Sequence, residues 1–184
     1  MKTLIHLPLA VMALAFSSMG LARSPLDLVD ELDLERYQGR WYEIALLPNR
    51  FQKRCVSDTS AHYVLRQDGR VDVTNRCRRA DGSWIIAEGV ARKIDPDGPN
   101  AALEVRFAPR WLSWLPFVWG DYRVIALGAD YEYAMVGSDN RRYLWILARQ
   151  PTLETTVLER LQSTAEAQGF DLHNLEMSAH RDAP

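Results

Sequence analysis

Cysteine is scarce in this sequence of 184 residues, with Cys55 and Cys77 as the only two. Two thiols are too few ligands for a metal site, and the four histidines lack ligand spacing, so we expect no metal. An even number of cysteines in a chain that enters an oxidising compartment favours a disulfide over free thiols. We therefore expect a Cys55–Cys77 disulfide, with a reactive nucleophile as the alternative.

Other absences narrow the classes of function. Acidic and basic residues are mixed along the chain, the formal net charge is −2 and no basic block is present, so nothing indicates nucleic-acid binding. No Pro/Gly/Ser-rich linker divides the chain, so one domain is expected. The motif G-x-S-x-G is absent and neither cysteine has an evident histidine partner, which argues against a nucleophilic enzyme. We predict no enzymatic activity and no cofactor.

One long apolar run is present, from Leu4 to Ala22, behind the basic Lys2. Its small residues at the end and its interruption by Pro8 are typical of a cleaved signal peptide, with a membrane-spanning helix as the alternative. We therefore predict a signal peptide at residues 1–22 and a single domain at residues 23–184. No cysteine follows the run to accept a lipid, so we expect a secreted, soluble, periplasmic protein, with outer-membrane association as the alternative.

Short β-rich runs, each ended by turn-forming residues, follow one another along most of the chain. This pattern is typical of an antiparallel barrel or sandwich, and a turn such as Gln67-Asp68-Gly69 indicates a hairpin. The eight expected strands are Trp41–Leu47, Ala61–Leu65, Val71–Asn75, Trp84–Ala91, Ala102–Phe107, Tyr122–Leu127, Glu132–Val136 and Tyr143–Ala148.

The tail changes to a helical period. Pro151 suits a first helical turn and Gly169 suits a helix C-terminus. Between them an apolar stripe has four-residue spacing, at Leu153, Val157, Leu161 and Ala165. The predicted fold class is all-β: an eight-stranded antiparallel up-and-down β-barrel with one C-terminal α-helix packed outside.

A closed barrel has two ends, and alternate links between strands lie at the same end. If the first strand rises from a sealed end, Cys55 and Cys77 both fall at the opposite, open end, where their pairing is plausible. The links expected there are Pro48–Val56, Arg78–Ser83, Arg110–Gly120 and Gly137–Arg142.

Three motifs in order resemble those of the lipocalin family. Gly39 and Trp41 form the G-x-W that enters the first strand, Asp130 and Tyr131 resemble the T-D-Y turn between strands six and seven, and Arg149 ends strand eight. The resemblance covers roughly residues 33–170 and is closest to the bacterial lipocalin and apolipoprotein D group. It departs at Ala129, which stands where the motif has threonine, and in lacking the cysteine that often anchors close bacterial relatives.

The motif residues are expected to have structural roles. Counting in twos along strands one and eight places Trp41 and Arg149 on one face at the sealed end. A guanidinium over an indole ring contributes roughly 0.5–2 kcal/mol and helps to plug the barrel.

The inward-facing positions above this plug are the candidate ligand-binding residues, with the plain filling of the barrel by side chains as the alternative. Tyr63, Trp145 and Leu147 also match lining positions of the apolipoprotein D type of barrel. Glu43 is expected to bond a neighbouring side chain, a water or the ligand's polar head, because an unpaired buried carboxylate is costly. The set is Tyr37, Glu43, Ala45, Tyr63, Val73, Asn75, Phe107, Trp145 and Leu147.

The segment of residues 110–120, the Trp-rich loop, places three tryptophans and a phenylalanine in a link at the open end: Trp111, Trp114, Phe117 and Trp119. Exposed apolar patches usually mark a membrane, partner or ligand contact, and tryptophan suits the membrane interface. Equal weight with membrane or partner contact is given to the alternative that the loop folds back and lids the barrel or that the sixth strand begins early.

The leading hypothesis is a carrier that binds a small apolar ligand, a fatty acid or (lyso)phospholipid, in the barrel and serves cell-envelope maintenance, the latter implied by the resemblance alone. One rival is an enzyme, since the resemblance includes relatives that isomerise or de-epoxidise a ligand inside the barrel. The other is an interaction module that forms a homodimer through the Trp-rich loop. The expected partners are therefore an apolar ligand, a transiently contacted membrane, or a second copy of the chain, and no nucleic acid.

Overall fold

The computed structural model describes residues 24–181, so the predicted signal peptide at residues 1–22 lies outside the described residues. A short helix α1 (Leu34–Tyr37) precedes the strands, and α2 (Thr155–Ala167) follows the eighth. No helix of residues 24–181 is long and apolar enough to cross a membrane. The strands are β1 (Gly39–Leu46), β2 (Ser57–Leu65), β3 (Val71–Arg78), β4 (Trp84–Lys93), β5 (Ala102–Arg106), β6 (Gly120–Leu127), β7 (Tyr133–Gly137), β8 (Leu144–Ala148) and β9 (Glu176–Met177).

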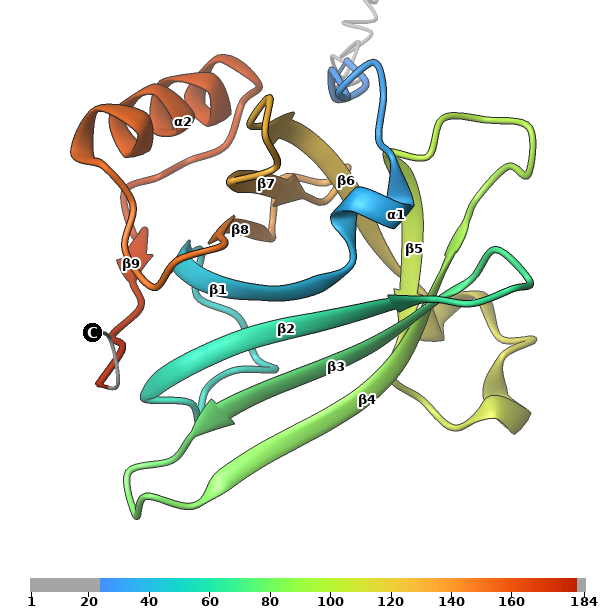
Figure 1. The fold of residues 1–184 in the computed structure, drawn as a ribbon, viewed down its shortest axis with the longest axis horizontal. Helices are drawn as coiled ribbons and strands as arrows, with labels where there is room; N and C mark the ends of the chain where they lie inside the picture. The colour runs from blue at the N-terminus through green and yellow to red at the C-terminus, as the bar shows by residue number, and fades with distance from the viewer. Residues whose placement is uncertain (1–23, 182–184) are drawn as a thin grey trace, which may run out of the picture.

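Strands β1 to β8 form a closed antiparallel barrel. Each strand pairs with the next one in the sequence, and β1 pairs with both β2 and β8, which closes the sheet. Closure leaves no free edge along these pairs, which is the physical reason that eight amphipathic strands adopt this arrangement. The predicted fold class is confirmed (Figure 1).

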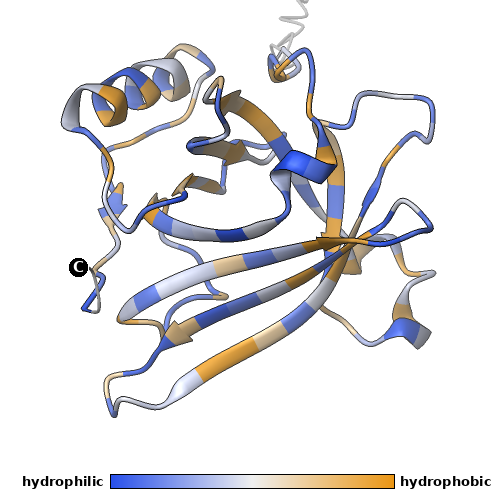
Figure 2. Cartoon of the chain, viewed as in Figure 1, coloured by the Kyte–Doolittle hydropathy of each residue, from blue (hydrophilic) through white to orange (hydrophobic). Residues whose placement is uncertain are grey.

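Two hydrophobic clusters lie on the two sides of the barrel wall. The inner cluster fills the barrel and includes Trp41, Tyr63 and Val136, while the outer cluster lies under α2 and includes Leu161 and Ala165. Apolar and polar residues interleave along β2 to β4, as expected for strands with one face inside and one outside (Figure 2). The predicted helical stripe therefore covers the outside of the barrel, although Pro151 precedes α2, which begins at Thr155.

The C-terminal segment adds a strand that the sequence pattern did not predict. β9 pairs with β1 through Ala45↔Met177 and Leu46↔Glu176. Beyond β9, the Ser178 amide donates to the Ile44 carbonyl at 2.9 Å, and the Asp58 amide donates to the Ala179 carbonyl at 2.8 Å. Since Ile44 belongs to β1 and Asp58 to β2, this segment bridges the two strands where they separate.

The closed end is held by Arg149, as the motifs predicted. Its guanidinium lies 3.8 Å from the centre of the Trp41 ring, and Trp41 is fully buried. Gly39 has φ +88°, a backbone conformation that glycine adopts without strain, and it lies next to Arg149. Arg149 also donates hydrogen bonds of 2.8–3.2 Å to the main-chain oxygens of Arg36, Gln38, Arg40 and Tyr131.

The two residues of the predicted T-D-Y turn have different roles. The Tyr131 hydroxyl accepts a hydrogen bond of 2.8 Å from the Asp33 amide, and its ring lies 4.1 Å from the Arg36 guanidinium. Tyr131 therefore ties the turn after β6 to the start of α1. Asp130 is exposed, and its amide donates to Glu132.

Candidate ligand-binding site

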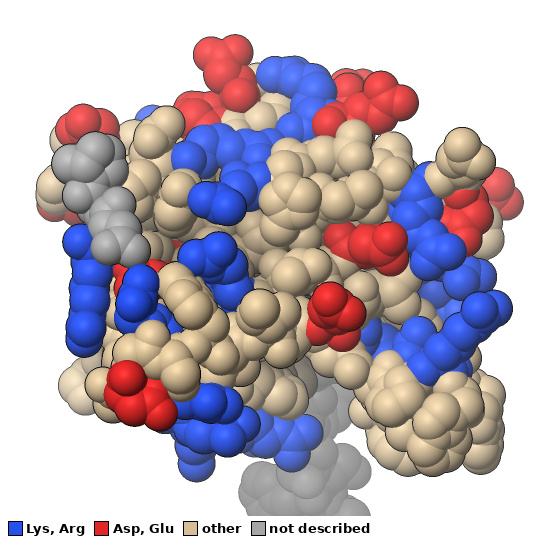
Figure 3. Space-filling model, turned by 60° about the horizontal axis from the view of Figure 1, so that its bottom comes forward, with Lys and Arg blue, Asp and Glu red and all other residues tan. Residues whose placement is uncertain are grey.

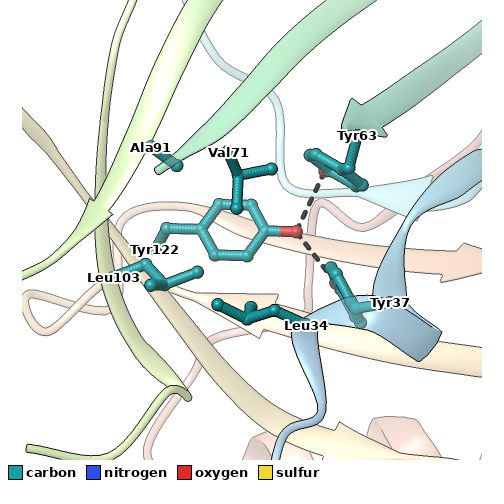
Figure 4. A pocket seen from close by; sticks show the side chains of 7 residues that line it. All are labelled: Leu34, Tyr37, Tyr63, Val71, Ala91, Leu103 and Tyr122. Carbon is teal, nitrogen blue, oxygen red and sulfur yellow. Dashed lines mark hydrogen bonds between the residues drawn. The ribbon is translucent and has the colours of Figure 1, made fainter. Parts of the chain in front are cut away.

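Three tyrosine hydroxyls meet inside the half of the barrel next to the closed end. We call this the lower half, and the half next to the open end the upper half. Tyr122 from β6 lies between Tyr63 from β2 and Tyr37 from α1 (Figure 4), with oxygen–oxygen distances of 2.9 Å and 2.8 Å. The tyrosine triad, as we call these three residues, joins three elements that are far apart in the sequence. It forms the floor of the interior.

The triad has one proton more than its own hydrogen bonds use. Three hydroxyls carry three protons, and the two bonds that link them consume two. With Tyr122 donating to Tyr63, the hydrogen of the Tyr63 hydroxyl remains available to an acceptor. Burial raises the pKa of Tyr63 to about 12 and raises the pKa values of Tyr37 and Tyr122 well above the usual one, so the triad is neutral at physiological pH.

The space beside the triad is too small for a lipid. A small pocket beside the triad, also lined by Leu34, Val71, Ala91 and Leu103, has a free volume of about 10 Å³, which is about one water-sized probe. The lower half of the barrel is therefore filled by side chains, as the alternative interpretation of the lining residues proposed. Any larger ligand has to lie above the triad, toward the open end.

The inner face of β4 carries only small residues. Cross-strand partners share a face of a sheet, and Val71, Val73 and Asn75 on β3 are paired with Ala91, Gly89 and Ala87 on β4. Val71, Val73 and Ala91 belong to the inner cluster, so all three β4 positions face the interior. None of these β4 side chains is larger than a methyl group.

Phe107 and Asn75 supply an aromatic ring and a polar group to the upper half. Phe107 follows β5 at a position whose side chain faces inward, and it is 42% exposed. Its ring occupies the place that a side chain at Gly89 would take, since a Cβ there would lie 2.7 Å from a ring carbon. Asn75 Oδ1 is buried and accepts no hydrogen bond. A buried amide oxygen without a donor is costly, so the upper half carries an acceptor that a ligand would satisfy.

Glu43 is satisfied by neighbouring side chains. Gln52 Nε2 donates to one carboxylate oxygen at 2.6 Å, and Ser178 Oγ donates to the other at 2.7 Å. Burial raises the pKa of Glu43, and the two hydrogen bonds partly oppose that rise. Gln52 Oε1 accepts a bond of 2.8 Å from Trp145 Nε1, so the network continues to the inner wall. Glu43 therefore holds the β1–β2 loop and the C-terminal segment together.

The position predicted for Ala45 is wrong. The β1–β8 register shifts between Glu43 and Ala45, and this bulge reverses the faces of the residues that follow. Ala45 is consequently buried in the outer cluster, with Met135 and Ile146. A prediction from the alternation of side chains along a strand cannot detect a bulge, because the inserted residue has no characteristic residue type. The other predicted lining residues, Tyr37, Tyr63, Val73, Asn75, Phe107, Trp145 and Leu147, face the interior.

Several inner residues were missed by the sequence analysis. Tyr122 was assigned to a strand but not to the site, and the inward-facing small residues of β4 were overlooked. The alternation of Ala87, Gly89 and Ala91 within a predicted strand is a pattern that indicates one face with only small side chains. The pairing of Tyr122 with Tyr37 has no such pattern, because it depends on α1 reaching across the barrel.

The open end carries the disulfide and the Trp-rich loop. Cys55 and Cys77 are bonded, with their Cα atoms 5.5 Å apart. The Trp-rich loop neither lids the barrel nor extends β6 far, since it forms the 3-10 helices η1 (Arg110–Leu112) and η2 (Pro116–Val118) before β6 begins at Gly120. Trp119 folds back onto the wall, whereas Trp111, Trp114 and Phe117 are 73–78% exposed.

These features define a small closed barrel with one sealed end, one open end and a partly polar interior, the architecture of a ligand-binding protein. A Lipocalin-like domain model matches residues 32–180. The chain therefore belongs to the lipocalin family.

Individual relatives support the same assignment. The chain is 39% identical to temperature-induced lipocalin-1 of Arabidopsis thaliana, covering 88% of this chain and 87% of that protein. It is 37% identical to the outer membrane lipoprotein Blc of Escherichia coli K12 (90% and 92% covered) and 31% identical to apolipoprotein D of Macaca fascicularis (90% and 86%). Among solved structures, apocrustacyanin C2 has a TM-score of 0.64 at 15% identity, covering 82% of this chain and 81% of that one, and shows the same fold.

Proposed function

We propose that the upper half of the barrel binds one amphipathic lipid, a fatty acid or a lysophospholipid, and carries it without chemical change. The observation that carries the proposal is the small side chain of Ala87 on the inner face of β4, paired with Asn75, whose amide oxygen is unsatisfied. An apolar wall with a few polar groups is typical of sites for small amphipathic molecules. The free hydrogen of Tyr63 and the acceptor of Asn75 suit a hydroxyl or a protonated carboxyl, which both donates and accepts.

A catalytic role is less well supported than carriage. Both sulfurs are used in the disulfide, so no thiol nucleophile is present among the described residues. The buried hydroxyls of the tyrosine triad have raised pKa values and are poor bases near neutral pH.

The similarity to an outer membrane lipoprotein supports a location in the cell envelope, in agreement with the signal peptide and the periplasmic location predicted from the sequence.

Filling the upper half should test the site directly. We expect Ala87→Phe to weaken the binding of oleic acid and of lysophosphatidylcholine at least about tenfold, since a ring would take the space of the ligand. Binding is measured by titration calorimetry and by native mass spectrometry after delipidation. Ile86→Phe is the matched control, because Ile86 is the preceding residue, is exposed and lies on the opposite face. Equal affinity of Ala87→Phe and wild type would contradict the proposal.

We also propose that the carrier meets a bilayer through the Trp-rich loop. The loop consists of tight turns, with i→i+3 main-chain hydrogen bonds that begin at Pro109 and end at Trp119. Trp111, Trp114 and Phe117 have the same i→i+3 spacing and are all exposed. Replacing Trp111 and Trp114 by Ser should reduce binding to liposomes, and unchanged binding would remove this part of the proposal. A homodimer through the same loop would instead appear as a change in size-exclusion volume.

A further inference from the structure

Two arginines are equally buried but differ in their partners. Arg106 on β5 and Arg123 on β6 are each 7% exposed. Arg123 forms ion pairs with Asp139 at 2.7 Å and Asp121 at 3.2 Å. Within residues 24–181, Arg106 has no carboxylate partner: its one hydrogen bond runs from Nη1 to the Ala108 carbonyl, and its Nε is buried without an acceptor. A buried cation without an anion is costly, so an anionic partner would stabilise Arg106.

The unpaired guanidinium lines a pocket on the outer wall. Arg66, Asp72, Glu88 and Arg110 also line this pocket. Asp72 is engaged by Arg66 at 3.5 Å, and Glu88 is exposed and outside ion-pair distance of Arg106. Arg110 likewise has no carboxylate partner in the described part of the chain. The pocket therefore offers two cations, Arg106 and Arg110, that form no direct ion pair with a carboxylate within residues 24–181.

Trp119 joins this pocket to the Trp-rich loop. Its ring lies 4.0 Å from the Arg92 guanidinium and 5.2 Å from that of Arg106, and its Nε1 donates to the Ser113 carbonyl at 2.9 Å. Arg92 is already paired with Glu104 at 2.7 Å. Trp119 thus fixes the base of the loop against the arginines, while the other three aromatic rings of the loop project away.

The surface near the loop has two parts. Figure 3 shows an uncharged protrusion at the lower right, with basic side chains gathered directly above it. The protrusion corresponds to the Trp-rich loop, which has no charged residue after Arg110. Apolar rings at a tip and cations behind them match the order of a bilayer surface, in which tryptophan occupies the interface and phosphates lie outside it.

We propose that Arg106 and Arg110 bind the phosphate group of a phospholipid in the bilayer that Trp111, Trp114 and Phe117 contact. The planar guanidinium group matches a phosphate with two parallel hydrogen bonds. This proposal rests on the bilayer contact proposed above but is independent of the ligand in the barrel. Phosphate recognition would orient the protein so that its open end faces the membrane.

The test compares two neutral vesicles that differ in phosphate. Phosphatidylcholine vesicles carry phosphate, and digalactosyldiacylglycerol vesicles do not. By co-sedimentation we expect Arg106→Gln with Arg110→Gln to lower the affinity for phosphatidylcholine about fivefold or more and to leave the galactolipid binding unchanged. Trp111→Ser with Trp114→Ser should lower both. Arg40→Gln is the matched control for Arg110→Gln alone, because Arg40 is exposed at the closed end and each of these two variants removes one positive charge.

Each outcome bears on one part of the proposal. Unchanged phosphatidylcholine binding by the double arginine variant would overturn the phosphate site, whereas unchanged binding by the tryptophan variant would overturn the bilayer contact itself. Calorimetric binding of inorganic phosphate without any preference between the vesicles would identify a soluble anion as the occupant and overturn the lipid source.

Stability measurements separate the site from folding. Arg106→Gln should not lower the unfolding midpoint, because the charge it removes is unpaired. If that variant fails to fold, Arg110→Gln alone, at an exposed position, gives the same comparison of vesicles. A marked loss of stability in Glu88→Gln would reveal Glu88 as the counterion of Arg106 and would also overturn the proposal.

Discussion

Both ends of the barrel place an arginine against a tryptophan, yet the two pairs serve different purposes. At the closed end Arg149 stacks on Trp41 and donates to four main-chain carbonyls. At the open end Arg106 lies beside Trp119 with one carbonyl acceptor and a buried Nε left over. A cation with most of its donors satisfied stabilises the fold, and one with an unsatisfied donor is the kind of group that a partner would complete. The same residue pair can therefore mark stability at one end and binding at the other.

The sharpest test of this contrast replaces one tryptophan at each end. Trp41→Ala should cost about 3–5 kcal/mol in the free energy of unfolding, because it empties a fully buried site and removes the ring under Arg149. Trp114→Ala should change that free energy by less than about 0.5 kcal/mol, because its ring is exposed. Urea unfolding measures both. A large loss for Trp114→Ala would show that the loop belongs to the core and would break the comparison.

A smaller effect is expected from the hydroxyl at the centre of the tyrosine triad. Tyr122→Phe removes both hydrogen bonds of the triad and should cost about 1–3 kcal/mol in stability. Tyr143→Phe, on the wall near the open end, is the control and should remain within about 0.5 kcal/mol of the wild type. If both variants behave alike, the triad hydrogen bonds contribute little and the floor is held by packing alone.

The smallest effect concerns the carboxyl of Glu43 and its dependence on pH. Because burial raises the pKa of Glu43 in the folded state, folding favours the protonated form. The associated stability is present below the unfolded pKa of about 4.3 and is lost as the pH rises through the folded pKa. Glu43→Gln should flatten this decline in unfolding free energy, whereas Glu159→Gln on the exposed side of α2 should keep it. A decline of equal steepness in Glu43→Gln would assign it to another group.

The success of the sequence interpretation depended on the range of the interactions involved. The G-x-W and the terminal arginine predicted the Arg149–Trp41 contact, because parity within two regular strands fixes both side chains. The same counting failed at Ala45, where a bulge after Glu43 reverses the faces. The C-terminal segment that reaches Glu43 through Ser178 gave no periodic pattern, because two-residue strands are too short to show one.

The sequence by itself indicated the family through the resemblance of three motifs, and it determined the number of barrel strands, the outer helix and the disulfide, which follow from local periodicity or from two cysteines with no other partner. Only the tertiary structure decided which polar groups are satisfied. The Glu43 carboxylate accepts hydrogen bonds from Gln52 and Ser178. Asn75 Oδ1 and Arg106 Nε are buried without a hydrogen-bond partner. Hydrogen bonding and charge pairing depend on atoms brought together from distant strands. The groups left without a partner, and hence the sites proposed for a ligand and a membrane, become visible only in the folded barrel.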